Sequence, residues 1–123
     1  MIESVGVDIV EVYRIKKAAE RWGDRFIDRI FTPWEINYCR SKSFPEQSFA
    51  ARFAVKEAVL KAIGTGLNKG AKWTSIEIVN DELGQPKVRL GQSIREIIGP
   101  RKIIISMSHT REHAVAAAIM YRD

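Results

Sequence analysis

The chain has 123 residues, which is the usual size of one domain, so we expect a single domain spanning residues 1–123. Its one cysteine, Cys39, excludes an internal disulfide framework and fits a reducing compartment, which predicts a cytoplasmic protein. No run of about 18 apolar residues exists, so no membrane span is expected, and the N-terminus lacks the basic start of a signal peptide. The net charge of +5 predicts an acidic partner, which could be nucleic acid, anionic lipid, a phosphate-rich small molecule or a protein.

The first element in the chain is a short strand, predicted over residues 5–10. Val7 and Ile9 point to one face of this strand, so Asp8 points to the other face, beside Gly6. Gly6 leaves room for close approach of a backbone or a ligand. An aspartate among valines and isoleucines is unusual. It is either a strand-end residue that faces water or a carboxylate with a function.

An amphipathic helix is predicted over residues 11–22, and Gly23 ends it. Its apolar stripe is formed by Val12, Ile15, Ala19 and Trp22. A basic stripe runs along another face and extends toward the next short helix; its residues are Arg14, Lys17, Arg21 and Arg25. This basic stripe is either a solvated face or a docking surface for an acidic partner.

Two further helices follow. Thr32, Pro33 and Glu35 have the spacing of a capping box with proline at the first helical position, so a helix is predicted from there to about Arg40. The run from Phe49 to Gly66 reads as one long helix that stops at a glycine pair, and because it is apolar on nearly every side it is predicted to lie in the middle of the fold. Pro45 suits its first turn, and the glycines at positions 64 and 66 suit its end.

Glu57 and Lys61 interrupt the apolar surface of this central helix, one helical turn apart. At this spacing the two side chains are able to touch. One reading is a surface ion pair, which contributes only about 0.3–0.5 kcal/mol. The other reading is a carboxylate and an ammonium held for chemistry, because a partly buried charge is costly without a functional or structural partner.

The C-terminal half predicts mainly strands. Residues 73–80 alternate and pair through a turn with residues 87–90, and a short helix follows over residues 92–98. The β-branched run 102–108 is predicted to be a buried strand, with Ser108, His109 and Thr110 at its end. The tail over residues 113–121 is rich in alanine, and its pattern alone leaves helix and strand open.

Asp8, Glu57 and the polar residues after the isoleucine run allow one common chemistry. Two carboxylates can hold a magnesium ion that completes its shell with water and substrate phosphates. Lys61, His109 and the neighbouring hydroxyl groups can then bind phosphate oxygens. The Gly64–Gly66 turn adds little by itself, because it lacks the phosphate-loop pattern GxxxxGK[ST].

Four motifs occur in order along the chain: GVDIV at 6–10, FTPWEINYC at 31–39, FAVKEAVLKAIGTG at 53–66 and SMSHTREHAVA at 106–116. They are spread over almost the full chain, from residue 6 to residue 116, and the third is highly specific. The combination resembles the phosphopantetheinyl transferases of the small holo-acyl-carrier-protein synthase type.

The resemblance implies an α+β fold, with an antiparallel sheet wrapped around the long central helix and with residues 113–121 as a strand. It implies transfer of the 4′-phosphopantetheine arm of coenzyme A to a serine of apo acyl carrier protein, a step in fatty acid biosynthesis, with release of adenosine 3′,5′-bisphosphate. It also implies a homotrimer with sites between subunits, and no nucleic-acid or membrane partner.

The same resemblance assigns residues to roles. Asp8 and Glu57 match the magnesium ligands. Glu57 is also the candidate base, directly or through a water, and Lys61 steadies or protonates the leaving bisphosphate. The residues expected to bind coenzyme A are Arg52, Lys61, Gly64, Gly66, Ser108, His109 and Thr110. The residues expected to bind the carrier protein are Arg14, Lys17, Arg21 and Arg25.

Two other functions remain as alternatives from the sequence. A nucleic-acid-binding domain would use the basic helix, but it leaves Asp8 and Glu57 unexplained and lacks the aromatic row of RNA-binding sheets. A metal-dependent phosphodiesterase would use the same carboxylates with water as nucleophile. The sequence does not name the preferred carrier protein or say whether acyl-coenzyme A is accepted.

Overall fold

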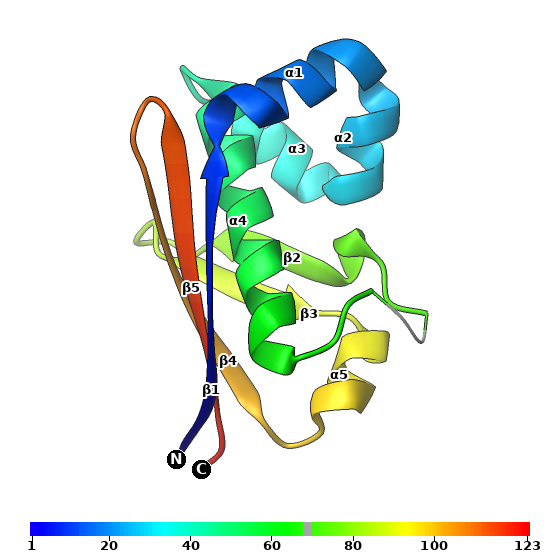
Figure 1. Ribbon diagram of the computed structural model, residues 1–123, viewed down its shortest axis with the longest axis vertical. Coiled ribbons are helices and arrows are strands. Elements are labelled where there is room, and N and C mark those ends of the chain that lie inside the picture. Colours follow the sequence, from blue (N-terminus) through cyan, green and yellow to red (C-terminus); the bar gives the residue numbers. More distant parts are fainter. Residues whose placement is uncertain (68–69) are drawn as a thin grey trace.

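The computed structural model describes residues 1–67 and 70–123. The fold is α+β, and the long helix α4 (Pro45–Ile63) packs across one face of a three-stranded antiparallel sheet (Figure 1). The strand order in this sheet is β1 (Ile2–Glu11), β5 (His113–Tyr121) and β4 (Lys102–His109). β2 (Ile76–Asn80) and β3 (Pro86–Leu90) form a separate antiparallel hairpin on another side of α4.

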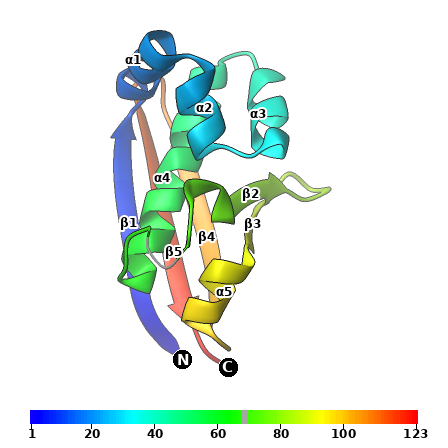
Figure 2. The same ribbon diagram turned by 90° about the vertical axis from the view of Figure 1, so that its right-hand side faces the viewer.

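The shorter helices lie at the two ends of α4 (Figure 2). α1 (Val12–Trp22), α2 (Asp24–Ile30) and α3 (Pro33–Arg40) gather at its N-terminal end, and α5 (Gln92–Ile98) lies near its C-terminal end. Trp73–Ser75 form one turn of 3₁₀ helix before β2. None of the helices in the described part of the chain is long and apolar enough to cross a membrane.

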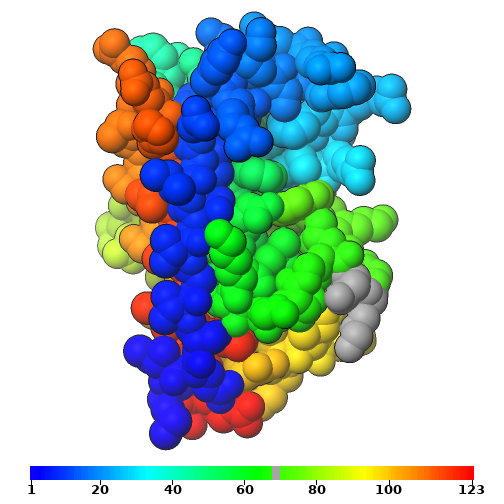
Figure 3. Space-filling model, viewed as in Figure 1, coloured from blue at the N-terminus to red at the C-terminus, as the bar shows by residue number. Residues whose placement is uncertain are grey.

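The predicted central helix is confirmed, and its small side chains explain how the sheet approaches it. Ala50, Ala54, Ala58 and Ala62 are all buried on α4. Gly6 of β1 lies directly against the helix backbone there, since a Cβ atom at position 6 would be 1.9 Å from the carbonyl oxygen of Ala58. The predicted close approach at Gly6 is therefore a contact between two backbones. It brings β1 alongside α4 over much of the length of the molecule (Figure 3).

Gly6→Ala is expected to lower the free energy of unfolding by about 1–3 kcal/mol or more, because the added methyl group overlaps backbone atoms that cannot rotate away. Urea unfolding followed by circular dichroism measures the effect. Gly91→Ala is the matched control, since its Cβ would meet its nearest neighbour, Ser75, at an ordinary 3.5 Å. Equal stability of the two variants would contradict the close contact.

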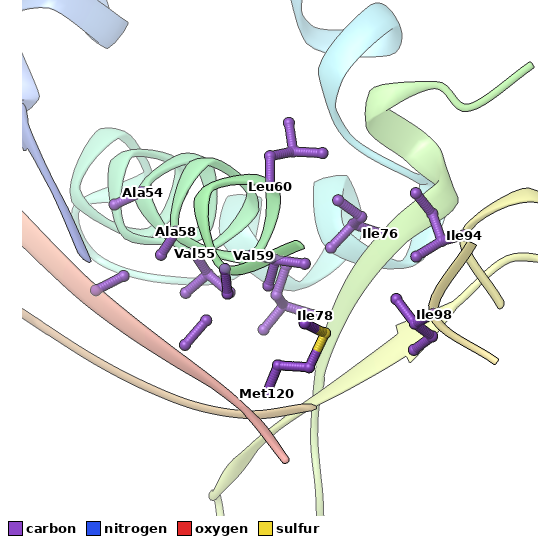
Figure 4. Close-up of a cluster of buried hydrophobic side chains, with 13 residues drawn as sticks. Ala54, Val55, Ala58, Val59, Leu60, Ile76, Ile78, Ile94, Ile98 and Met120 are labelled. Atoms are coloured by element: carbon purple, nitrogen blue, oxygen red, sulfur yellow. The ribbon is translucent and has the colours of Figure 1, made fainter. Parts of the chain in front are cut away.

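The apolar core has two parts. One joins α4 to β2, α5 and β5, and its side chains include Val59, Ile76, Ile78, Ile94 and Met120 (Figure 4). The other joins the N-terminal half of α4 to the three small helices, where the rings of Phe31 and Phe49 lie 4.8 Å apart.

A buried ion pair crosses between these parts, and the sequence pattern did not reveal it. Lys56 of α4 and Glu35 of α3 are both fully buried, with 2.8 Å between Nζ and Oε1. Lys56 Nζ also donates to the carbonyl oxygens of Ile30 (2.7 Å) and Trp73 (3.2 Å). Glu35 accepts hydrogen bonds from the backbone N–H groups of Thr32 and Ile78, both at 2.8 Å. The pair therefore ties α2, α3, α4 and β2 together, and the capping box predicted at Thr32 is one part of it.

Three expectations need correction. The strand over residues 102–108 is not buried, because only one face of its sheet is covered by α4, and Ile104 is 53% exposed. Trp22 is 52% exposed instead of belonging to the core, because it lies at the corner where Gly23 turns the chain into α2. Residues 73–75 form the 3₁₀ turn, so β2 begins later than predicted.

The ambiguous tail is a strand, as the resemblance implied. β5 pairs with β1 on one side and with β4 on the other, so it is the middle strand of the sheet. Its alanines at 114, 116 and 118 face α4 and are buried, which explains why a helix-favouring composition occurs in a strand.

Candidate active site

Asp8, Glu57 and Lys61 meet where β1 runs beside α4. Asp8 lies two residues after Gly6 on the same face of β1, so it faces the helix, and its side chain is 16% exposed. Lys61 reaches from α4 to the strand, where its Nζ donates to Asp8 Oδ1 at 3.0 Å and to the carbonyl oxygen of Val7 at 3.0 Å. The two motifs that supply these residues are far apart in sequence, and the fold brings them together.

The expected contact between Glu57 and Lys61 is not formed. Lys61 pairs with Asp8 instead, and Glu57 makes no hydrogen bond or ion pair with any residue in the described part of the chain. The i, i+4 spacing allows the contact on an isolated helix, but the strand beside α4 offers Lys61 a carboxylate and a carbonyl at once.

Glu57 is an acid without a direct hydrogen-bond or ion-pair partner among the described residues. Partial burial raises its pKa, and the nearby negative charge of Asp8 raises it further, while Lys61 acts in the opposite direction. The two carboxylates are therefore close enough to repel one another. Such a pair of oxygen donors with excess negative charge fits a hard divalent cation such as Mg²⁺, which needs only one or two protein carboxylates.

No cluster of three or more histidine, cysteine, aspartate or glutamate side chains suited to a metal occurs among the described residues. A site built on Asp8 and Glu57 alone leaves most of a cation's coordination positions to water and to substrate oxygens. This is the arrangement expected for a metal that binds a substrate phosphate.

An open cleft of about 590 Å³ lies next to the acid pair. Glu57 and Lys61 line it together with two of the predicted coenzyme A residues, Gly64 and Gly66, and with the apolar side chains of Leu60 and Trp73. Gly64 has the left-handed conformation predicted for the end of the central helix, with φ of 87°. The cleft thus combines two charged side chains with apolar ones.

A second cleft, of about 360 Å³, contains Arg52 and His109, together with Tyr38, Lys42 and Ser48. Arg52 is 1% exposed, and its guanidinium lies 4.4 Å from the centre of the Tyr38 ring and donates from Nη2 to Asn80 Oδ1. Its Nε, however, has no hydrogen-bond partner in the described part of the chain. A buried guanidinium with an unsatisfied donor, near Lys42 and His109, suits an anionic ligand.

The predicted coenzyme A residues therefore fall into two groups within one chain. Lys61, Gly64 and Gly66 line the first cleft, whereas Arg52 and His109 line the second. Ser108 and Thr110 are exposed around the end of β4 next to His109, and the hydroxyl oxygen of Thr110 accepts hydrogen bonds from the backbone N–H groups of Glu112 and His113. Tyr38 and Lys42, which also line the second cleft, were not among the predicted site residues, although they lie within and just after the FTPWEINYC motif.

The basic stripe is exposed on α1 and at the start of α2, as predicted for its four residues, Arg14, Lys17, Arg21 and Arg25. Lys17 Nζ lies 5.7 Å from the centre of the Tyr13 ring, and the Arg21 guanidinium lies 4.9 Å from that of Trp22. Two of the four basic residues of the stripe therefore lie over aromatic rings. None of its four basic residues forms an ion pair with a described acidic residue.

Comparison with known proteins places these features in a family. The family model of the 4′-phosphopantetheinyl transferase superfamily matches residues 4–118. The holo-[acyl-carrier-protein] synthase of Chlamydia trachomatis is 49% identical over 115 residues, which cover 94% of this chain and 96% of that protein.

Solved structures agree with the sequence comparison. The crystal structure of the holo-[acyl-carrier-protein] synthase of Neisseria meningitidis is similar with a TM-score of 0.89 and 33% identity, covering 99% of this chain and 100% of that one. The holo-(acyl-carrier-protein) synthase of Bacillus anthracis, in complex with CoA (3′,5′-ADP), is similar with a TM-score of 0.83 and 34% identity, covering 100% and 99%. The matched region includes β1, α4 and the β4–β5 pair, which carry the site.

Proposed function

The chain belongs to the 4′-phosphopantetheinyl transferase superfamily, and we propose that it is a holo-[acyl-carrier-protein] synthase. The enzyme transfers the 4′-phosphopantetheine group of coenzyme A to a serine of apo acyl carrier protein and releases adenosine 3′,5′-bisphosphate. The observation that carries the proposal is the family match over residues 4–118, which contains the Asp8, Glu57 and Lys61 cluster.

We propose that Asp8 and Glu57 hold a magnesium ion, because their carboxylates repel one another and Glu57 lines an open cleft in which Lys61 is the one cation among the described residues. When bound, such an ion supplies positive charge that neutralises the diphosphate of coenzyme A.

In this proposal Glu57 accepts a proton and Lys61 stabilises a developing negative charge. The serine oxygen attacks the phosphorus that bears the pantetheine arm, and the bond from that phosphorus to the bridging oxygen breaks. Glu57 accepts the serine proton, directly or through a water, as a general base. The Lys61 ammonium stabilises the negative charge that develops on the leaving bisphosphate.

The second cleft is proposed to hold the nucleotide part of coenzyme A. The unsatisfied Arg52 Nε and the nearby His109 offer donors to phosphate oxygens, and Ser108 and Thr110 lie beside them. The Bacillus anthracis relative holds CoA (3′,5′-ADP), which supports the presence of a nucleotide site in this family.

A homotrimer with sites at the subunit interfaces is also proposed, and two features support it. The sheet face turned away from α4 is apolar and exposed; its residues include Val5 (57%), Val7 (54%), Ile9 (66%), Ile104 (53%) and Val115 (41%). A patch of this kind is typical of a surface that another protein covers. In addition, the predicted coenzyme A residues lie in two clefts of one chain, and a second copy of the chain would bring residues of both kinds together in one site.

Light scattering during gel filtration tests the oligomer. The expected mass is three times the 14.0 kDa of one chain. Val7→Lys, which places a charge in the middle of the apolar face, is expected to shift the protein toward the monomer. A wild-type monomer at micromolar concentration would contradict the trimer without affecting the assignment of the reaction.

Charge reversal on α1 tests carrier docking. Arg14→Glu/Arg21→Glu is expected to raise KM for apo acyl carrier protein by about tenfold or more, because two attractive contacts to an acidic partner become repulsive, while KM for coenzyme A changes little. Steady-state kinetics with each substrate varied in turn measures both constants. Lys87→Glu/Lys102→Glu makes the same change of net charge away from α1 and serves as control. Equal losses for the two substrates would argue against the docking stripe.

The reaction itself is tested by mass spectrometry of apo acyl carrier protein after incubation with the protein, coenzyme A and magnesium. A mass gain of one phosphopantetheine, abolished by EDTA, is expected. Release of the bisphosphate without any carrier protein would instead indicate a phosphodiesterase. Tight binding of nucleic acid that magnesium and coenzyme A do not affect, with no transfer, would indicate a nucleic-acid-binding domain.

A further inference from the structure

Lys61 binds Asp8, one of the two acids that are proposed to hold the metal. Its Nζ lies 3.0 Å from Asp8 Oδ1, and a second hydrogen bond of 3.0 Å to the carbonyl oxygen of Val7 fixes the ammonium on β1. The position is therefore defined by two acceptors on the strand and is not a chance approach of a mobile side chain. The Glu57 carboxylate, one helical turn before Lys61, has no such partner among the described residues.

The same ammonium is free to leave. The Lys61 side chain is 53% exposed, and it also lines the cleft beside Glu57. Because the lysine side of this ion pair is exposed, water can hydrate the released ammonium, and a more strongly bound ligand of Asp8 can displace it. The cleft gives the released side chain a place close to where substrate phosphates are proposed to lie.

A divalent cation and the ammonium compete for one carboxylate. A cation shared between Asp8 and Glu57 would carry its charge a few ångströms from Nζ, and like charges at such separations repel strongly near a protein surface. Simultaneous binding of the divalent cation and the Lys61 ammonium to Asp8 is therefore disfavoured. The cation also relieves the repulsion between the two acids, which Lys61 relieves only in part.

We propose that the Lys61 ammonium is bound to Asp8 in the metal-free protein, and that a divalent cation binds to Asp8 and Glu57 by displacing this ammonium. The inference rests on the proposed metal site of Asp8 and Glu57 and adds an exchange of cations to it. The displaced ammonium becomes available to the phosphates of the substrate. Loading of the metal and placement of Lys61 for catalysis are then one event.

The exchange is tested by the affinity for Mn²⁺, measured from the electron paramagnetic resonance signal of the free ion, with no substrate present. Lys61→Met removes the charge and keeps the length of the side chain, and it is expected to tighten Mn²⁺ binding by roughly three- to tenfold. Lys61→Gln is expected to do the same. Lys61→Arg keeps the charge and is expected to stay within about twofold of the wild type.

Lys102→Met is the matched control, because it removes the same charge from another exposed lysine–aspartate pair, Lys102 and Asp123, away from the cleft. It is expected to leave the Mn²⁺ affinity unchanged within about twofold. Unchanged or weaker binding in both Lys61→Met and Lys61→Gln overturns the proposal. Tightening in Lys61→Arg or Lys102→Met as large as in Lys61→Met overturns it as well.

Asp8→Asn separates failure of this inference from failure of the metal site. The variant is expected to lose most of the Mn²⁺ affinity. Wild-type affinity in Asp8→Asn means that the ion binds elsewhere, which overturns the proposed metal site and the exchange with it. Loss of affinity in Asp8→Asn together with no tightening in Lys61→Met leaves the metal site in place and overturns only the exchange.

Discussion

Glu57→Gln is expected to lower kcat for phosphopantetheine transfer by at least about 10³-fold. A glutamine side chain cannot accept the serine proton, a role that contributes about 10²–10⁴-fold, and it also removes one of the two proposed metal ligands. Mass spectrometry of the carrier protein over time measures the rate. Normal turnover would show that Glu57 has neither role.

The same variant is expected to be folded, and slightly more stable than the wild type at neutral pH. Burial and the charge of Asp8 raise the folded-state pKa of Glu57 above its ordinary 4.5, so the ionised carboxylate destabilises the fold once the pH exceeds that ordinary value. Falling pH protonates Glu57 and removes this cost, so the difference between variant and wild type should shrink on acidification. Urea unfolding in the absence of divalent metal, at pH 7 and near pH 4, measures both differences.

Lys56→Met is expected to lower the free energy of unfolding by about 3–5 kcal/mol. It leaves the fully buried Glu35 carboxylate without its cation and removes donors from the carbonyl oxygens of Ile30 and Trp73. Burial lowers the pKa of Lys56 and Glu35 opposes that shift, so the lysine charge depends on this partner. Urea unfolding at one fixed protein concentration measures the loss, since an oligomer couples stability to concentration.

A double-mutant cycle identifies the pair as the cause. Glu35→Gln/Lys56→Met is expected to be less destabilised than the sum of its single variants by roughly 1–3 kcal/mol, because the second change removes the uncompensated charge that the first one leaves. Lys102→Met, which breaks an exposed pair, should lower the free energy of unfolding far less than Lys56→Met does. Additive losses at Glu35 and Lys56 would mean that the two buried groups act independently.

Much of the fold was predictable because local rules and the apolar pattern agree. The capping box at Thr32 and the apolar run ending at Gly64 correctly gave α3 and α4. The alternation around Asp8 gave the correct face of β1. The alanine-rich β5 was not predictable from propensity, because its strand conformation comes from pairing with β1 and β4 on both sides. Here the resemblance supplied what the local pattern left open.

The candidate site was predictable as a set of residues but not as a set of contacts. Motif spacing identified Asp8, Glu57 and Lys61, yet the expected helical pair was wrong because Lys61 reaches across to β1. Helical periodicity describes neighbours within one element and contains no information on a strand that packs beside it. The buried Lys56 was overlooked for the same reason, since its partner Glu35 belongs to another helix.

The contact at Gly6 has a consequence for how this enzyme can change. Asp8 is carried by β1 and Glu57 by α4, and at Gly6, two residues before Asp8, the main chains of these two elements are in direct contact. The distance between the two acids therefore depends little on substitutions elsewhere in the core, because those change side-chain packing and not the backbone contact at Gly6. The interior of the protein can drift in sequence while the two carboxylates keep their separation.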